Sequence, residues 1–476
     1  MVSILTICYN MIYPGGENMD FSYVYSQNPW WEDNESIYFD MHIRKFEKSK
    51  FKYIPYFMKN LKNYKNGIYI IKGPRQIGKT TVLKLLIKDL IEKNINPSNI
   101  LYLTLDLIKD ENELTQLLLD YFSIKNNNKE KRYLFLDEVS SVSNWQKSIK
   151  YLYDTGKLEN AFVVLTGSSS YDLKKSSERL PGRREFGKDI VYLPVSFREY
   201  IMQNSNIDFQ YKLEDLFEMN ENELKALNLK LTRFKDDFKT YISTGGFPKV
   251  INDFLENNAI SEETLNTYGN YLYGDVERFN RSRLILNQLL FKTPDLIGQR
   301  FSWNSLSNDI EGVSSKNTIE DYFNLLSMNF LFGILFFYDF SKKTIKPKKQ
   351  KKIYPLDLII TFVIEKITNT QIKLSTKIKQ IVFTHLLKYS KDLSEGLMLY
   401  NGPYFWYSQK GKEIDFLINL KNNIIPIEVK FQNNISPSDY STMKKVFQKG
   451  ILVTKNTLFK KDDIVALPIE SFLLLV

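Results

Sequence analysis

The feature that most constrains the fold is a loop bounded by two glycines, Gly73-Pro74-Arg75-Gln76-Ile77-Gly78-Lys79-Thr80-Thr81. It matches the pattern G-x-x-x-x-G-K-[ST] at every defined position. An apolar run at 68–71 precedes it, and residues 80–92 carry apolar side chains at the spacing of a helix packed on a sheet. In such a setting, backbone N–H groups and the helix N-terminus hold phosphate groups. A chance match lacks this context, so the loop predicts a nucleotide site.

A second motif follows in the apolar run 133–136, which ends in Asp137 and Glu138. Alone, the acid pair could cap a helix. Beside the loop, it is typical of a Walker B motif. We then expect Lys79 to reach the β- and γ-phosphates, Thr80 and Asp137 to hold Mg²⁺, and Glu138 to polarise the attacking water. The two motifs together predict binding and hydrolysis of ATP with Mg²⁺.

Two polar segments offer further catalytic candidates. Ser168 follows the apolar run 162–165 and is expected to sense the γ-phosphate or orient water, unless its serine-rich segment is only a helix-capping turn. Arg183 or Arg184 could serve as an arginine finger that neutralises charge on the transferred phosphoryl group. The alternative for the arginines is a solvated basic loop.

Alternating apolar runs and helical stretches indicate an α/β fold with a parallel sheet covered on both faces. The expected strands are 68–71, 100–105, 133–136, 162–165 and 190–193. Residues 196–280 are expected to be mainly helical. Three helices at 284–291, 302–310 and 315–326 predict a winged helix, and the seven lysines within 342–352 predict a solvated wing or linker.

Six motifs occur in order along the chain: Asn28-Pro29-Trp30-Trp31, the phosphate loop, Phe135-Leu136-Asp137-Glu138, Leu165-Thr166-Gly167-Ser168, Leu180-Pro181-Gly182-Arg183 and Gly245-Gly246-Phe247-Pro248. The series resembles the archaeal-type AAA+ P-loop ATPases that carry a C-terminal winged helix and a restriction-endonuclease-like domain of unknown function. The resemblance extends over nearly the whole chain from about Met19. It leaves the biological role open.

The motifs and the resemblance divide the chain into five parts. They are an N-terminal aromatic extension at 1–60, of which 1–18 are expected to lack order, a P-loop ATPase core at 61–195, a helical lid at 196–280, a winged helix at 281–345 and a restriction-endonuclease-like α/β domain at 346–476. The tryptophans of the extension are expected to anchor it to the ATPase core.

Acids in the C-terminal part suggest a second site. Asp415, next to Glu413, and then Glu428-x-Lys430 match the D…E-x-K pattern of restriction-endonuclease-like folds. Glu428 and Lys430 share one face of a strand, so Asp415 and Glu428 could hold a second Mg²⁺ while Lys430 activates water. The alternative is an ordinary Glu–Lys pair on a solvated face. Such folds often use another acid on a preceding helix, but the helix expected at 377–389 offers Lys379 and Gln380 instead, which argues against cleavage.

Composition excludes several other classes of protein. The single cysteine, Cys8, excludes an internal disulfide and Cys-based metal sites, and two histidines, His42 and His385, are too few for a His-rich metal site. His385 is expected to be packed in the core. The most apolar stretch, 330–337, is far shorter than the roughly 20 residues that span a bilayer, so we expect a cytoplasmic protein without a membrane partner.

The expected function is Mg²⁺-dependent ATP hydrolysis by an AAA+ ATPase, coupled to activity on double-stranded DNA. The formal charge of +10 permits nucleic-acid binding without requiring it. One alternative is a nucleotide-controlled switch or scaffold that binds other proteins or associates with itself. Another is an ATP-gated, Mg²⁺-dependent nuclease. DNA stimulation of the ATPase would favour the first, and cleavage lost on Asp415→Ala would be required for the last.

Overall fold

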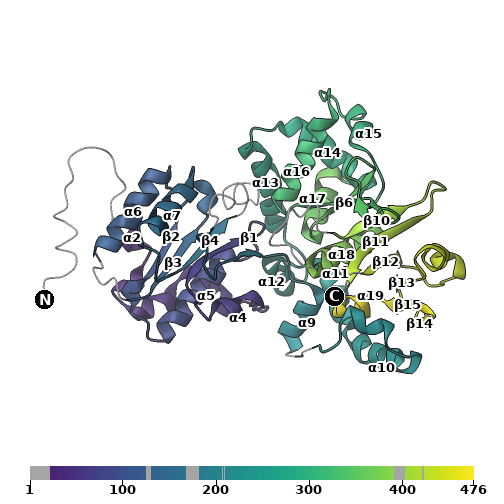
Figure 1. Cartoon of the computed structure of the whole chain (residues 1–476), viewed down its shortest axis with the longest axis horizontal. Coiled ribbons are helices and arrows are strands. Elements are labelled where there is room, and N and C mark those ends of the chain that lie inside the picture. The colour runs from purple at the N-terminus through teal and green to yellow at the C-terminus, as the bar shows by residue number, and fades with distance from the viewer. Residues whose placement is uncertain are drawn as a thin grey trace. The chain divides into compact units, whose positions relative to one another are not determined.

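The computed structural model describes residues 22–124, 130–167, 182–205, 207, 209–390, 402–420 and 423–476. The chain divides into two compact units, 1–192 and 193–476, each built around its own sheet (Figure 1). No helix in the described ranges is long and apolar enough to cross a bilayer. Residues 1–18 and Ser168 lie outside the described residues, so their predicted order and role stay predictions.

The first unit contains a five-stranded sheet in the order β2-β3-β4-β1-β5, parallel throughout. Its strands are β1 (Gly67–Lys72), β2 (Ile100–Thr104), β3 (Arg132–Asp137), β4 (Ala161–Gly167) and β5 (Asp189–Val191). Each overlaps an apolar run that predicts a strand. The expected α/β fold with a parallel sheet is therefore confirmed.

Helices cover both faces of this sheet (Figure 1). They are α2 (Ser22–Ser26), α3 (Met41–Lys48), α4 (Phe57–Leu61), α5 (Lys79–Glu92), α6 (Glu111–Ile124) and α7 (Trp145–Asp154), with 3₁₀ turns η1 (Pro29–Trp31), η2 (Asn34–Phe39), η3 (Pro97–Asn99) and η4 (Val139–Ser141). Alternate strand residues such as Ile70 and Leu136 pack in one apolar cluster with α6 and α7. Their neighbours Tyr69 and Phe135 meet Phe162 on the other face, which α5 covers. This alternation follows from the two-residue period of a strand.

The second unit begins with helices, as expected for 196–280. They are α9 (Phe197–Ser205), α10 (Glu221–Leu231), α11 (Lys235–Thr244), α12 (Pro248–Asn257) and α13 (Glu262–Arg278), with η5 (Leu213–Phe217) and η6 (Thr232–Phe234). The turn between α11 and α12 requires glycine, because Gly245 has φ +73° and a Cβ there would lie 2.3 Å from Asp357 Oδ1. Asp357 is buried and accepts the Gly246 N–H at 2.7 Å, which fixes this turn.

Three helices and a hairpin follow. They are α14 (Arg283–Leu296), α15 (Trp303–Asn308), α16 (Lys316–Met328), and the antiparallel pair β6 (Phe332–Phe336) and β9 (Lys351–Pro355), with β7 (Tyr338–Asp339) and β8 (Thr344–Ile345) paired between them. The expectation that the whole lysine run is solvated is wrong for its last two members. Lys351 and Lys352 lie on β9 and are 3% and 0% exposed. Lys351 packs with its Nζ 4.5 Å from the Trp303 ring centroid.

The C-terminal part contains a six-stranded mixed sheet in the order β10-β11-β12-β13-β15-β14. Its strands are β10 (Tyr404–Tyr407), β11 (Glu413–Leu420), β12 (Asn423–Lys430), β13 (Lys449–Thr454), β14 (Phe459–Lys461) and β15 (Asp463–Pro468). Its helices are α17 (Leu358–Thr368), α18 (Leu374–Tyr389) and α19 (Ile469–Leu475), with the 3₁₀ turn η7 (Pro437–Tyr440) and the π-helical turn η8 (Met443–Phe447). The pairs β12–β13 and β13–β15 are parallel, and the other pairs are antiparallel.

His385 lies on α18 and is buried in the second unit, as expected. Its Nε2 accepts the Phe197 N–H at 2.8 Å, so its Nδ1 carries the proton and donates to the Ile381 carbonyl, also at 2.8 Å. Burial lowers the pKa of His385 to about 4. The ring is therefore a neutral packing residue that joins two segments of the unit.

Candidate functional site

The phosphate loop connects β1 to α5, and the backbone conformation requires glycine at both of its glycine positions. A Cβ on Gly73 would lie 2.4 Å from the Tyr192 carbonyl oxygen, and Gly78 has φ +107°, which side chains disfavour. The loop therefore turns sharply at the carboxyl edge of the parallel sheet. Among the other predicted contact residues, Ile77 is buried, whereas Arg75 and Thr81 are half-buried.

The ammonium of Lys79 lies inside this loop. Its Nζ donates to the carbonyl oxygens of Gly73 and Pro74, both at 3.0 Å, and lies 3.9 Å from Glu138 Oε1. Lys79 is only 5% exposed. The charge is thus held at the N-terminus of α5, where a phosphate oxygen would find both the ammonium and the positive end of the helix dipole.

Asp137, at the end of β3, is surrounded by three hydroxyl groups. Thr80 Oγ1 donates to its Oδ2 at 2.6 Å, and Tyr102 OH donates to the same oxygen at 3.1 Å. The Thr166 hydroxyl donates to Oδ1. Asp137 is 3% exposed, so these contacts fix the carboxylate beside Thr80, the residue with which it is predicted to share Mg²⁺.

Glu138 follows with φ +54°, a left-handed conformation that is strained for a side chain other than glycine. Its backbone N–H donates to Thr166 Oγ1 at 3.1 Å, which holds the residue in that conformation. The structure therefore brings together Lys79, Thr80, Asp137 and Glu138 at one edge of the sheet. Thr166, which links the two acids, was missed by sequence reasoning, which selected Ser168. The signal that could have identified Thr166 is its position as a polar residue at the carboxyl end of β4, the strand next to β3.

The N-terminal aromatic segment binds the edge of β2, the strand that carries Tyr102. The Asn28 side chain accepts the Tyr102 N–H at 2.7 Å and donates to the Tyr102 carbonyl at 2.9 Å, so it binds the open edge of β2 like a short strand. The indole N–H groups of Trp30 and Trp31 donate to the Ile100 carbonyl at 3.2 and 2.8 Å. The predicted anchoring of both tryptophans to the ATPase core is thus confirmed, and Asn28 is an additional contact that the pattern did not indicate.

A buried lysine strengthens the same region. Lys84, on the inner side of α5, lies with its Nζ 3.5 Å from the Tyr102 ring centroid and 5.0 Å from that of Trp30. Its charge is balanced by Asp40 at 3.2 Å. Burial lowers the pKa of Lys84, while Asp40 opposes that shift. The segment from Asn28 to Asp40 therefore packs on β2 and α5 and supports the tyrosine that contacts Asp137.

The two candidate arginine fingers form ion pairs with acidic residues of the first unit. Arg183 forms an ion pair with Asp154 at 2.7 Å, and Arg184 pairs with Asp189 at 2.5 Å. The Arg184 carbonyl accepts the N–H of Ile68, at the amino end of β1, whereas the phosphate loop follows its carboxyl end. The structure thus does not bring the Arg184 backbone to the nucleotide edge, and a finger role for either arginine stays a prediction.

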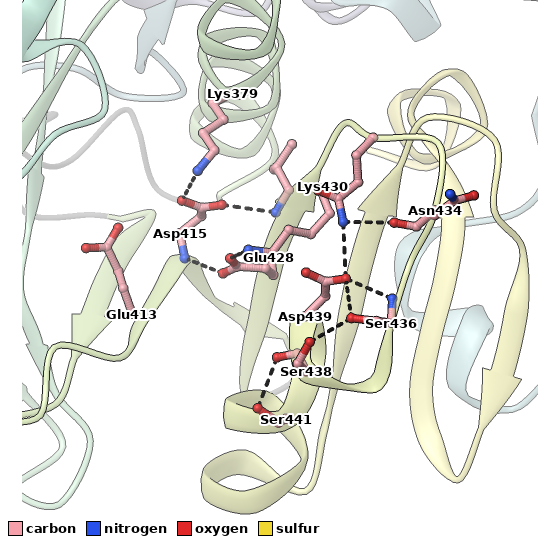
Figure 2. Close-up of polar contacts among 12 residues, drawn as sticks. Lys379, Glu413, Asp415, Glu428, Lys430, Asn434, Ser436, Ser438, Asp439 and Ser441 are labelled. Carbon is pink, nitrogen blue, oxygen red and sulfur yellow. Dashed lines mark hydrogen bonds and ion pairs between the residues drawn. The ribbon is translucent and has the colours of Figure 1, made fainter.

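The C-terminal acids form a separate cluster, with Asp415 on β11 and Glu428 on β12. The Asp415 N–H donates to Glu428 Oε2 at 3.1 Å, and Asp415 Oδ2 accepts the Val429 N–H at 3.1 Å. Lys430 Nζ lies 3.0 Å from Glu428 Oε1. Burial and the nearby Asp415 raise the pKa of Glu428 to about 7. The sequence-predicted D…E-x-K residues therefore come together on adjacent strands (Figure 2).

Two further lysines enter this cluster from other elements. Lys379 reaches from α18 to Asp415 Oδ1 at 2.6 Å, and Lys352 on β9 lies 3.7 Å from the same oxygen and pairs with Glu413 (Figure 2 shows Lys379, Glu413 and Asp415). Gln380 instead accepts a hydrogen bond from Thr361 away from the acids. In the part of the chain that the structure describes, no group of three or more His, Cys, Asp or Glu residues is arranged to hold a metal ion.

Comparison with known proteins gives three family matches. Residues 65–201 match the family described as an AAA domain, and residues 235–370 and 377–472 match two families described as domains of unknown function, DUF8612 and DUF4143. An uncharacterized protein of Methanocaldococcus jannaschii is 27% identical over 436 residues, covering 88% of this chain and 87% of that protein. An uncharacterized protein of Haemophilus influenzae is 25% identical over 402 residues, covering 81% of this chain and 88% of that protein.

Among solved structures, the Walker-type ATPase of Pyrococcus abyssi is similar with a TM-score of 0.38 and 12% identity, covering 65% of this chain and 93% of that one. The AAA domain match spans all five strands of the parallel sheet and both nucleotide motifs. Family match and strand order agree, so the first unit contains a P-loop domain of the AAA+ type.

Proposed function

We propose that this chain binds ATP with Mg²⁺ and hydrolyses it at the carboxyl edge of the parallel sheet. The observation that carries the proposal is the 2.6 Å contact of Thr80 with Asp137, beside Lys79 and Glu138. A hydroxyl and an ammonium from the start of α5 meet two carboxylates from the end of β3 there. Phosphoryl transfer needs these groups because its catalysis consists mainly of positioning and charge stabilisation.

The residues present fit both cofactors. The loop backbone can wrap phosphates because glycine occupies the positions at 73 and 78 where a Cβ would clash or strain. Thr80 and Asp137 offer the hard oxygen ligands that Mg²⁺ prefers. An Mg²⁺ ion bound there would neutralise part of the charge on the phosphates. Thr166, Tyr102 and Asn28 keep the Asp137 carboxylate in place, and a fixed carboxylate costs no rearrangement when the nucleotide binds.

Glu138 is the proposed base. Its carboxylate is about a quarter exposed, with 28% of the side chain accessible, so water can reach it. Its Oε1 lies 3.9 Å from Lys79 Nζ, so the side chain points toward the phosphate loop. It can there accept a proton from a water positioned in line with the γ-phosphate.

The test is steady-state ATP hydrolysis by the full chain and three variants. Glu138→Gln should lower turnover by about 10²–10⁴-fold while still binding ATP, because only the base is removed. Lys79→Ala should lose nucleotide affinity and turnover together. Lys93→Ala, an exposed lysine just after α5, is the matched control and should behave like wild type. Unchanged turnover in Glu138→Gln would refute the role of that residue.

We propose further that hydrolysis is coupled to double-stranded DNA through the predicted winged helix at 281–345, with the helices at 196–280 acting as a lid. The supporting observation is the segment between β6 and β9, where Lys342, Lys343, Lys348 and Lys349 are exposed after three helices. Exposed lysines on a hairpin suit phosphate contacts, and four of them would make log affinity fall with log salt with a slope of down to about −3.6.

DNA-stimulated turnover that weakens with salt and disappears when the four exposed lysines become glutamine would support the coupling. Turnover that is slow and indifferent to DNA would instead favour the nucleotide-controlled switch acting on proteins. In that case the exposed hairpin would be tested next as a protein-binding surface.

A further inference from the structure

The acids on β11 and β12 belong to a cluster in which cations outnumber carboxylates. We call it the Asp415 cluster, and its members are Glu413, Asp415, Glu428, Lys352, Lys379, Lys430 and Arg300. Four cationic side chains face three carboxylates. The question is whether the cluster can hold the second Mg²⁺ that the D…E-x-K pattern suggests.

Every carboxylate oxygen of the cluster already faces a nitrogen donor. Asp415 uses Oδ1 for Lys379 and Oδ2 for the Val429 N–H. Glu428 uses Oε1 for Lys430 and Oε2 for the Asp415 N–H. Glu413 uses Oε1 for Lys352 and Oε2 for Arg300 Nε, the latter at 2.8 Å. No oxygen of the three acids is left directed only toward solvent.

Burial keeps this arrangement in place. Asp415 is 1% exposed and Lys352 is fully buried. Lys352 is also fixed through its backbone, because β9 pairs with β6 in register across Leu335 and Lys352. An ammonium confined in this way stays paired with Glu413, and it lies farther from Asp415 than Lys379 does.

The position of Lys379 is the decisive contact. Its Nζ lies 2.6 Å from Asp415 Oδ1, on the side of the carboxylate that faces α18 rather than the sheet (Figure 2). Mg²⁺ would need this oxygen, and it demands near-octahedral oxygen ligands. It would also have to sit among three ammonium groups, and like charges at such separations in a buried site repel strongly. The residues therefore do not fit the ion.

We infer that the Lys379 ammonium takes the place of a divalent cation in the Asp415 cluster, so that this cluster binds no Mg²⁺ and does not cleave nucleic acid by metal-assisted hydrolysis. The cluster instead joins β9 and the Arg300 segment to the six-stranded sheet through ion pairs. The phosphate loop of the first unit is a separate candidate Mg²⁺ site, and the inference stands whether or not that loop hydrolyses ATP.

The experiment uses the full chain without nucleotide and measures bound Mn²⁺ by electron paramagnetic resonance. All proteins carry Asp137→Asn, which removes the metal ligand at the phosphate loop. The parent should show no saturable Mn²⁺ site. Lys379→Met keeps the length of the side chain but removes its charge, and it should gain one site that binds at least about tenfold more tightly than any in the parent. Adding Asp415→Asn should abolish the gained site.

Lys444→Met is the matched control, because Lys444 also pairs with a carboxylate of the second unit, Asp462, but lies outside the cluster. It should gain nothing. A saturable Mn²⁺ site in the parent that is lost on Asp415→Asn would overturn the inference. So would a Lys379→Met protein that keeps the melting temperature of the parent but gains no site, since Lys379 would then not be what excludes the metal. If that variant is poorly folded, Lys379→Gln gives the same comparison.

Discussion

Replacing Asn28 by alanine should destabilise the first unit strongly, although Asn28 lies far in sequence from the nucleotide motifs. The side chain is fully buried. It donates to the Val24 and Tyr102 carbonyls at 2.7 and 2.9 Å and accepts the Tyr102 N–H at 2.7 Å. Alanine removes all three hydrogen bonds and leaves both backbone groups of Tyr102 without the partner that now shields them.

The size of the effect follows from these contacts. A buried hydrogen bond contributes about 1 kcal/mol net, and an unsatisfied buried group costs about 1–3 kcal/mol, so the loss should be about 3–5 kcal/mol. With a urea dependence of about 2–3 kcal/mol per molar, the unfolding midpoint of the first unit should fall by about 1–2.5 M. At urea concentrations below the unfolding midpoint, ATP turnover by Asn28→Ala should also be lower than by the wild type, because Tyr102 OH contacts Asp137.

The assay is hydrogen exchange in increasing urea, followed by mass spectrometry on peptides that contain β2, which isolates this unit from the rest of the chain. Gln27→Ala is the matched control. It removes one bond to the Thr104 N–H at a partly exposed position and should cost only about 1 kcal/mol. If Asn28→Ala exchanges like Gln27→Ala, the idea that Asn28 substitutes for a neighbouring strand is refuted.

Two further predictions concern buried titratable side chains of the second unit. Burial lowers the pKa of His385 from 6.5 to about 4, so on acidification the unfolded chain takes up this proton before the folded chain does. The free energy of unfolding should therefore fall by up to about 3 kcal/mol as the pH drops from 6.5 to 4. His385→Gln should remove that part of the acid sensitivity, and melting profiles that stay parallel from pH 7 to 4 would contradict it. Burial also lowers the pKa of Lys351 from 10.5 to about 8, so holding it charged at pH 7 costs up to about 3 kcal/mol. Lys351→Met should raise the melting temperature at pH 7, with an advantage that shrinks between pH 8 and 10.5, whereas a lower value at pH 7 would show that the Trp303 contact outweighs burial.

Much of the first unit could be predicted because its signals are local. A strand, a glycine loop and a helix follow one another within the segment around Lys79, and the period of apolar residues fixes each element. The carboxyl ends of parallel strands meet at one edge, so Asp137 could be placed beside Lys79 without knowledge of the fold. Thr166 followed the same rule but was overlooked in favour of the more conspicuous serines after it.

The remaining contacts could not be predicted because they join distant segments. Nothing local to Lys352 or Lys379 indicates that both approach Asp415, since one lies on a hairpin strand and the other on a helix. A run of lysines normally signals a solvated surface. Here, strand pairing turns its last two members inward, and that pairing depends on partners in β6, Phe336 for Lys351 and Leu335 for Lys352.

The side-chain contacts along β2 also affect how the protein behaves toward other chains. An unpaired edge strand is a template on which another chain can add a strand and begin to aggregate. Along β2 the outward carbonyl or N–H groups at Ile100, Tyr102 and Thr104 are bound by side chains: those of Trp30 and Trp31, of Asn28, and of Gln27 and Tyr23. A fragment starting at residue 61 would keep every nucleotide motif, yet it would leave this edge open to intermolecular strand pairing.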